Sequence, residues 1–279
     1  MAVDNLKLLA GSLLDDVSLA VTSEHNDYPI ENLQNNQPSQ KWRSSSAAVQ
    51  TIIALLTEDT PISAFALWAH NLTEDSSLRL ELSQESDFST LEYDATFDGL
   101  DPYYGLGEGP LGLHGLGGYS DAATIYPYTV HWFEVVIARY VRITLTDTAN
   151  ANGYLQAGRL MLGQEWSPTV NHDWGAAIKT QDDSALIRTR GGGLRATPHV
   201  PYRVIDVGFS WLDENDLAEL ERIRHLTGKR GGALISVYPN EGGTRERLYT
   251  VFGRLTSWSE NSRQPTHLYY SGLHIEEAI

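Results

Sequence analysis

The sequence contains no cysteine, which excludes disulfide bonds, zinc–thiolate centres and thiol nucleophiles. It also lacks any run that approaches the ~20 apolar residues of a transmembrane helix, so no membrane insertion is expected. A short apolar stretch opens the chain, but it does not have the pattern of a signal peptide, which begins with positive charge and continues with an unbroken apolar region. Here Asp4 precedes the nearby Lys7, and the pair Asp15-Asp16 interrupts the apolar stretch. We therefore expect a protein that is made and folded in a cytoplasm and is stable without covalent cross-links.

Basic residues are scarce, with 20 Lys and Arg against 36 Asp and Glu and a net charge of −16. Residues 1–165 carry 22 acidic and 7 basic residues, whereas residues 166–279 carry 14 and 13. This change in composition predicts two domains, 1–165 and 166–279. A strongly acidic domain repels phosphate backbones, so nucleic acid is not expected as a partner. We interpret the acidity as a contribution to solubility.

The motifs of common catalytic sites are missing as well. None of the nine histidines has the spacing that would place two metal ligands on one helical face, and no Gly-x-Ser-x-Gly elbow occurs. The glycine run at 105–109 lacks the strand and helix of a dinucleotide fingerprint, and the run at 190–195 lacks the Lys-Ser/Thr of a P-loop. Paired carboxylates such as Asp98 and Asp101 lie in turn-like contexts. The sequence predicts a protein that is not an enzyme and needs no cofactor.

Alternating apolar residues predict strands. Between residues 133 and 163, the odd-numbered positions from Ile137 to Leu145 are almost all apolar and are predicted to face a core, whereas Val136 to Thr144 occupy the other face. Two earlier segments are predicted to alternate into a core in the same way: Ile62, Ala64 and Ala66, and Leu78, Leu80 and Leu82.

The order of motifs in residues 1–165 resembles that of the galactose-binding-like jelly roll, found in discoidin domains and carbohydrate-binding modules. The resemblance rests on the turn Tyr28-Pro29-Ile30-Glu31-Asn32-Leu33, on Trp42, on the strand Arg139–Ile143 and on the closing run Leu160–Leu162. It implies a β-sandwich with Trp42 in its core. The segment 97–132 is longer than the family's usual loop at this place.

The second half predicts a smaller β domain with one amphipathic helix. Gly191–Gly193 predict the turn of a hairpin, Asp213 can cap a helix over 213–227, and Leu217, Leu220, Ile223, Arg224 and Leu226 mark its stripe. Three strands are predicted in 231–239, 247–258 and 266–278. This order resembles that of distal-tail and minor tail proteins of tailed phages. The predicted fold class is therefore all-β, a galactose-binding-like jelly-roll sandwich followed by a tail- or baseplate-like domain that folds by itself.

A sugar site needs aromatic faces and a few planar polar groups. Six residues are candidates, four in the long 97–132 segment and two after a predicted strand: Tyr103, Tyr104, His114, Tyr119, His70 and Asn71. The alternative interpretation is that the aromatic residues fold the loop onto its own sandwich or against another subunit.

Sandwiches of the resembled family often carry a structural calcium ion, and Asp15, Asp16, Asp27 and Glu165 are conceivable ligands. Their spacing does not single them out, so the presence of a metal stays open.

Two hypotheses for the function follow. The first is a virion protein of a phage tail tip or baseplate, which assembles with copies of itself and other tail proteins and displays a sandwich that contacts host surface glycans. Many copies on one particle would turn weak single-site binding into firm attachment. The alternative is a soluble bacterial carbohydrate-binding module of a glycan-processing system.

Overall fold

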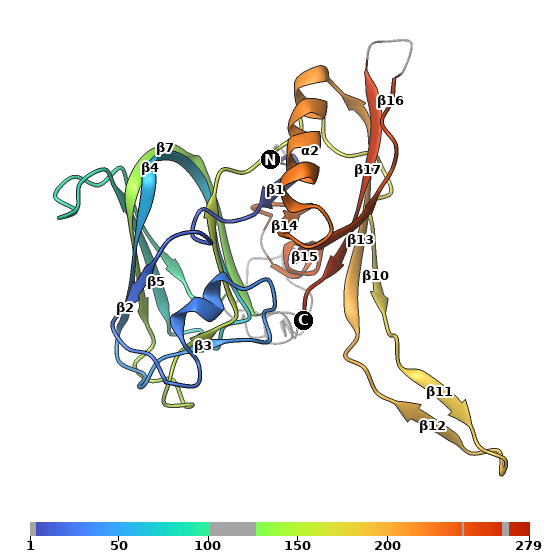
Figure 1. Ribbon diagram of the computed structural model, residues 1–279, viewed down its shortest axis with the longest axis horizontal. Helices are drawn as coiled ribbons and strands as arrows, with labels where there is room; N and C mark the ends of the chain where they lie inside the picture. Colours follow the sequence, from blue (N-terminus) through green and yellow to red (C-terminus); the bar gives the residue numbers. More distant parts are fainter. Residues whose placement is uncertain (1–3, 101–126, 242, 264–267) are drawn as a thin grey trace, which may run out of the picture.

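The computed structural model describes residues 4–100, 127–241, 243–263 and 268–279. Antiparallel strands dominate it and form two β bodies that lie side by side (Figure 1). We call residues 11–163 the sandwich, and residues 4–10 with 164–279 the second domain. The expected all-β class is confirmed. No helix in the described part of the chain is long and apolar enough to cross a membrane.

The main sheet of the sandwich has the order β2 (Leu19–Val21), β4 (Gln50–Trp68), β7 (Tyr128–Thr146), β5 (Ser77–Ser83) and β6 (Tyr93–Asp98), with β9 (Arg159–Gly163) also paired to β4. A short 3-10 helix, η1 (Ile30–Gln34), and the strand pair β3 (Trp42–Arg43) and β8 (Gln156–Ala157) complete the body. Trp42 is fully buried in the core, as the sequence predicted.

The strands β4 and β7 are long because each serves two layers. Residues 50–55 of β4 pair with β2 and β7, whereas residues 64–68 pair with β9 and β7. Register shifts after Leu55 and after Ile62 mark the passage from one layer to the other. Apolar side chains from both halves of β4, including Ile52 and Phe65, meet the leucines of β5 in one core.

These shifts correct part of the predicted strand faces. The odd-numbered residues from Val141 to Leu145 are buried as predicted, but Ile137 is 52% exposed, Arg139 is exposed and Ala138 is buried. The alternation changes where the pairing with β4 is irregular, because between the pairs Leu55–Tyr140 and Thr60–Ala138 the strand β4 has three more residues than β7.

The second domain is built on a sheet with the order β1 (Lys7–Ala10), β14 (Gly232–Ser236), β15 (Thr250–Trp258), β17 (Tyr269–Glu277), β13 (Tyr202–Leu212) and β10 (Ala177–Gln181), with β16 (Ser262–Arg263) paired to β17. The three predicted returning strands correspond to β14, β15 and β17. A separate hairpin, β11 (Ala185–Arg188) and β12 (Leu194–Thr197), extends between β10 and β13.

The helix α2 (Glu214–Thr227) begins and ends as its sequence predicts. The Asp213 carboxylate accepts a hydrogen bond from the Asp216 backbone N–H, and Gly228 ends the helix with φ of 51°. Leu220 and Ile223 are buried in the core of the second domain, but Leu226 is 62% exposed and does not belong to the buried stripe. A second helix, α3 (Gly243–Tyr249), was not expected, because this segment was interpreted as a turn and the start of a strand.

The first strand of the chain belongs to the second domain, which changes the expected boundary. Residues 7–10 form β1 and pair antiparallel with β14, while Leu8 and Trp166 exchange backbone hydrogen bonds at 2.8 Å on the other side of β1. The sandwich is thus inserted between β1 and the rest of the second domain. Leu6 and Leu8 are fully buried in the core beneath α2, so a chain that starts at residue 166 lacks part of that core.

A third apolar cluster joins the two bodies. Leu9 of β1, Leu234 and Phe252 of the second domain pack against the layer of β4, β7 and β9 in the sandwich. Trp68 stacks on Tyr128, with ring centroids 4.7 Å apart and planes 3° apart, and Phe252 lies 6.3 Å from Trp68. Ala64 and Ala66, which were predicted to face the sandwich core, are buried in this cluster instead.

Candidate functional site

Four of the predicted sugar-binding residues, Tyr103, Tyr104, His114 and Tyr119, lie outside the described residues. His70 is described and is 3% exposed. Its Nε2 atom lies 3.0 Å from the Thr129 hydroxyl, and its Nδ1 atom accepts a 3.3 Å hydrogen bond from the Leu72 N–H. Both ring nitrogens therefore contact other parts of the protein, and the buried ring offers no surface for a sugar.

Asn71 is likewise held by the backbone around it. Its side-chain amide donates to the Tyr154 carbonyl at 2.9 Å, and its oxygen accepts from the Gln156 N–H at 2.8 Å. These bonds tie the end of β4 to the segment before β8, which is a structural role. A direct role of Asn71 in sugar binding stays a prediction.

The burial of His70 leads to a pH dependence of stability. Burial, assisted by the positive charge of Arg247, lowers the pKa of His70 from 6.5 to about 3. Between these values the unfolded chain binds a proton that the folded chain does not, so stability is full above pH 6.5 and falls as the pH drops toward 3. We expect His70 to account for a loss of roughly 2–3 kcal/mol in the free energy of unfolding between pH 7 and pH 4.5.

Urea denaturation of the wild type and of His70→Gln at the two pH values measures this contribution. Glutamine keeps a polar group near Thr129 but does not titrate, so the variant should lose less stability on acidification than the wild type does. Equal losses in both proteins would show that His70 is not the source.

The conceivable calcium ligands do not converge. Asp15 binds Arg159 at 2.7 Å, Glu165 lies 4.0 Å from Lys7, and Asp27 lies 3.8 Å from His25. No group of three or more His, Cys, Asp or Glu side chains with the geometry of a metal site occurs among the described residues. Asp15, Asp27 and Glu165 thus have other partners, and the four candidate carboxylates do not form a common site.

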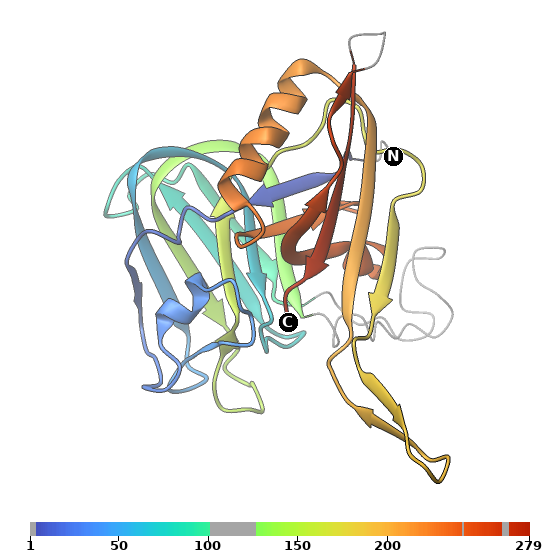
Figure 2. The same ribbon diagram turned by 45° about the vertical axis from the view of Figure 1, so that its right-hand side comes forward.

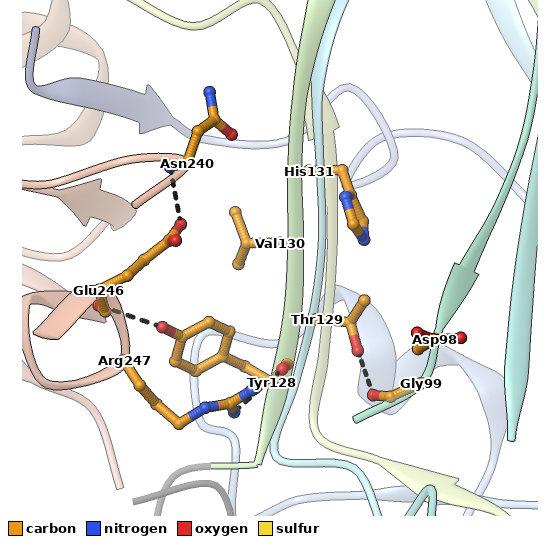
Figure 3. Close-up of a pocket in the computed structure, with 9 residues that line it drawn as sticks. All are labelled: Asp98, Gly99, Tyr128, Thr129, Val130, His131, Asn240, Glu246 and Arg247. Carbon is orange, nitrogen blue, oxygen red and sulfur yellow. Dashed lines mark hydrogen bonds between the residues drawn. The ribbon is translucent and has the colours of Figure 1, made fainter. Parts of the chain in front are cut away.

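A pocket of about 330 Å³ lies at the seam between the sandwich and the second domain (Figure 3). It is lined by the end of β6, the start of β7 and the segment around α3: Asp98, Gly99, Tyr128, Thr129, Val130, His131, Asn240, Glu246 and Arg247. In Figure 3 the side chains of Tyr128 and Arg247 lie next to each other, with the Arg247 guanidinium 4.7 Å from the centre of the Tyr128 ring.

The chemistry of this pocket favours a structural role. Burial raises the pKa of the Tyr128 phenol well above its usual value, so the phenol stays protonated and donates to the Glu246 carbonyl at 3.3 Å. The Thr129 hydroxyl donates to the Gly99 carbonyl at 2.5 Å, and the His131 ring stacks on Phe97. The contacts of Tyr128 with Glu246 and Arg247 fasten the second domain to the sandwich, whereas the other two contacts hold β6 and β7 together within the sandwich. The expectation that the protein is not an enzyme stays a prediction.

The hairpin β11–β12 forms an arm that projects from the second domain in both views (Figures 1 and 2). We define the arm as residues 184–199. All residues of its two strands are exposed, including Leu186 at 63%, Ile187 at 62% and Leu194 at 59%. The predicted glycine turn is present, since the Thr189 N–H donates to the Gly193 carbonyl at 2.8 Å and Gly192 has φ of 84°.

A cluster of an arginine and two tyrosines lies on the sandwich and was not predicted from the sequence. The Arg43 guanidinium lies 4.2 Å from the centre of the Tyr28 ring and 4.0 Å from that of Tyr154. Arg43 follows the buried Trp42 in β3, so strand alternation alone predicts that its side chain leaves the core. Tyr154 is far away in the sequence, and only the pairing of β3 with β8 brings the rings together.

No protein-family model matches the sequence, and no curated protein matches it. Several solved structures are similar to part of the chain. Chitosan-binding module 1 of a chitosanase/glucanase from Paenibacillus sp. IK-5 is 15% identical, with 55% of this chain and 98% of the module covered and a TM-score of 0.37.

Two further structures are a carbohydrate-binding module, CBM32-5, from Clostridium perfringens in complex with GalNAc-β-1,3-galactose, and the lectin domain of lectinolysin in complex with Lewis B antigen. The first is 13% identical, with 56% of this chain and 100% of that chain covered and a TM-score of 0.38. The second is 12% identical, with 55% and 96% covered and a TM-score of 0.38. These are carbohydrate-binding and lectin domains, the class that residues 1–165 resemble in sequence. At such identities and TM-scores the similarity identifies neither a ligand nor an activity.

Proposed function

We propose that this protein is a structural component of a phage tail tip or baseplate, which assembles through its second domain and displays the sandwich outward. The observation that carries this proposal is the arm. A two-stranded hairpin by itself is marginally stable in water, and this one exposes Leu186, Ile187 and Leu194 with no core of its own. Such an element gains stability when a neighbouring subunit covers its apolar side chains.

The charge distribution supports contact between copies of the chain. The arm carries Arg188, Arg190 and Arg195 and no acidic residue, whereas residues 1–165 have a net charge of −15. Opposite charges on two parts of one molecule favour a head-to-tail contact, in which the arm of one copy meets another copy. A contact of this kind closes into a ring when the rotation between neighbours allows it.

The sandwich supplies the second part of the proposal, a contact with glycans on the host surface. The half-buried cluster of Tyr28, Arg43 and Tyr154 supports it, because aromatic side chains and a fixed polar group are what sugar sites use. Multiple copies on one particle would raise the overall affinity well above that of a single site. The protein would then reside in the virion.

Removing the arm tests the assembly. We expect that replacing residues 185–197 by a short glycine-containing turn leaves the fold intact, because every residue of this segment is exposed, and converts multimers of the wild type into monomers. Light scattering after size-exclusion chromatography measures the mass, and circular dichroism checks the fold.

A triple variant, Leu186→Ser with Ile187→Ser and Leu194→Ser, should have the same effect as the deletion. Its matched control is Val49→Ser with Ile53→Ser, since these residues are 42% and 41% exposed on the sandwich. If the wild type is monomeric at all concentrations, or if only the control disrupts the multimer, assembly through the arm is wrong. A monomeric wild type would favour the alternative of a soluble carbohydrate-binding module.

A further inference from the structure

The basic residues of the acidic half of the chain are mostly paired with carboxylates. Of the seven in residues 1–165, Lys7, Arg79, Arg142 and Arg159 contact Glu165, Asp94, Glu81 and Asp15, respectively. Lys41, Arg43 and Arg139 form no salt bridge within the described part of the chain. Two of these three are neighbours, since Lys41 directly precedes β3 and Arg43 lies in β3, on either side of the buried Trp42.

Two cations side by side without a carboxylate are unexpected in a half with 22 acidic residues, where a counterion would be easy to supply. Each positive charge disfavours the charged form of the other side chain. Burial and the nearby charge of Arg43 lower the pKa of Lys41 below its usual value. A bound anion would relieve this repulsion.

The Arg43 guanidinium is held in place for such an anion. The rings of Tyr28 and Tyr154 flank it at 4.2 and 4.0 Å, and its Nη2 atom donates to the Gln156 side-chain oxygen at 3.3 Å. Its Nε–H is buried and has no hydrogen-bond partner in the described structure, although an unsatisfied buried donor is costly. The orientation of the group is thus fixed before a ligand arrives, which reduces the entropic cost of binding.

The polar groups around Arg43 that lack a partner are hydrogen-bond donors. The hydroxyl groups of Tyr28 and Tyr154 form no hydrogen bond with any described residue, and the Lys41 ammonium adds a further donor. The carboxylate of Asp27, the residue before Tyr28, lies 3.8 Å from His25, and its side chain is 82% exposed. An acceptor-rich, negatively charged group is therefore the complementary ligand.

We propose that Lys41 and Arg43, framed by Tyr28 and Tyr154, bind the carboxylate of an acidic sugar. This inference rests on the proposed glycan contact and specifies its chemical class. The two cations face the carboxylate, the tyrosine hydroxyls bond to carboxylate or ring hydroxyl oxygens, and the edges of the two aromatic rings contact the apolar face of the sugar. A neutral sugar would leave the two positive charges uncompensated.

The test uses the full-length chain and isothermal titration calorimetry. An oligogalacturonate and a sialyllactose provide the two natural sources of a sugar carboxylate, and a neutral galacto-oligosaccharide and lactose are the matched uncharged ligands. We expect at least one acidic sugar to bind about 10- to 100-fold more tightly than its neutral counterpart, the range expected for hydrogen bonds to a charged group. The difference should shrink as the salt concentration rises.

Two variants locate the site. Arg43→Gln and Lys41→Gln should each weaken binding of the acidic sugar by about 10-fold or more, with melting temperatures measured to confirm that both variants fold. The control is Arg139→Gln, which removes the third unpaired cation at an exposed position of β7 and should leave the affinity unchanged.

The outcomes separate the inference from the proposed function. If neutral sugars bind as tightly as acidic ones and Arg43→Gln has no effect, the acidic-sugar site is wrong while the glycan contact survives. If acidic sugars bind but all three variants reduce affinity equally, the binding is a general charge effect and the site is also wrong. If no sugar binds, both the site and the proposed glycan contact fail.

Discussion

Replacing Arg203 by methionine is expected to lower the free energy of unfolding by about 3–5 kcal/mol. Arg203 lies in β13 and is 1% exposed, and its guanidinium forms a salt bridge with Glu277, whose side chain is 7% exposed. It also donates to the carbonyls of Arg247 and Leu248 at 2.9 and 3.1 Å. The substitution would leave the buried Glu277 carboxylate with only the backbone N–H of residue 203 as a donor and would remove the guanidinium from two carbonyls, which costs more than the loss of packing alone. Equilibrium unfolding in urea measures the change.

A double variant distinguishes the charge from the packing. Arg203→Met combined with Glu277→Met removes both charges, so we expect it to be less destabilised than the sum of the two single variants, with a coupling of about 1–3 kcal/mol. Arg222→Met is the matched control, because Arg222 forms an exposed pair with Glu219 on α2 and such pairs contribute little. If Arg203→Met proves as mild as Arg222→Met, the buried pair does not stabilise the second domain.

The position of this pair explains why its loss should also affect the junction between the two bodies. The Arg203 guanidinium lies 6.0 Å from the Trp68 ring of the sandwich and bonds to the carbonyl of Arg247. The Arg247 side chain in turn donates to the Tyr128 carbonyl at 3.4 Å. Charged side chains of β13 and α3 therefore reach the same Trp68–Tyr128 stack that the apolar cluster uses. Unfolding of the second domain would expose this stack and loosen the seam.

Local signals in the sequence predicted local structure well. The helix over 213–227 was predicted from Asp213 as a cap and Gly228 as a terminator, and both act as expected because capping depends only on residues within one turn. The leucines of β5, Leu78, Leu80 and Leu82, are all fully buried, as strict alternation predicts for a strand without irregularity. Periodicity fails where the register between two strands shifts, as it does between Ala138 and Tyr140.

Features that depend on distant residues could not be predicted. Nothing in Leu6, Leu8 or Leu9 shows that the strand pairs with β14, more than two hundred residues later. The cluster of Arg43, Tyr28 and Tyr154 also depends on distant residues, because Tyr154 reaches Arg43 only through the pairing of β3 with β8. His70 was chosen as a candidate ligand residue because of its type, whereas its burial depends on neighbours such as Thr129 on another strand.

A chain of residues 166–279 is expected not to fold, in contrast to the expectation from the sequence. This fragment lacks β1, which pairs along its length with β14, and the residues just before it, so the fully buried Leu6 and Leu8 are missing from the core. Loss of two buried leucines costs roughly 4–10 kcal/mol, and the edge of β14 loses its backbone partners as well. The total is comparable to the net stability of an ordinary domain, about 5–15 kcal/mol. Circular dichroism and the dispersion of amide signals in a two-dimensional NMR spectrum measure the outcome.

The control for this experiment is a chain that lacks the inserted sandwich but keeps β1. Because Leu8 and Trp166 pair antiparallel, a short glycine-containing turn can join Ala10 to Gln164 and replace the whole sandwich. This shortened chain keeps β1 and its leucines, so it should fold cooperatively where the fragment 166–279 does not. It would expose Leu9, Leu234 and Phe252 of the seam, and serine at Leu9 and Leu234 would reduce aggregation. If the fragment without β1 folds as well as the shortened chain, β1 is dispensable and the second domain begins at residue 166 after all.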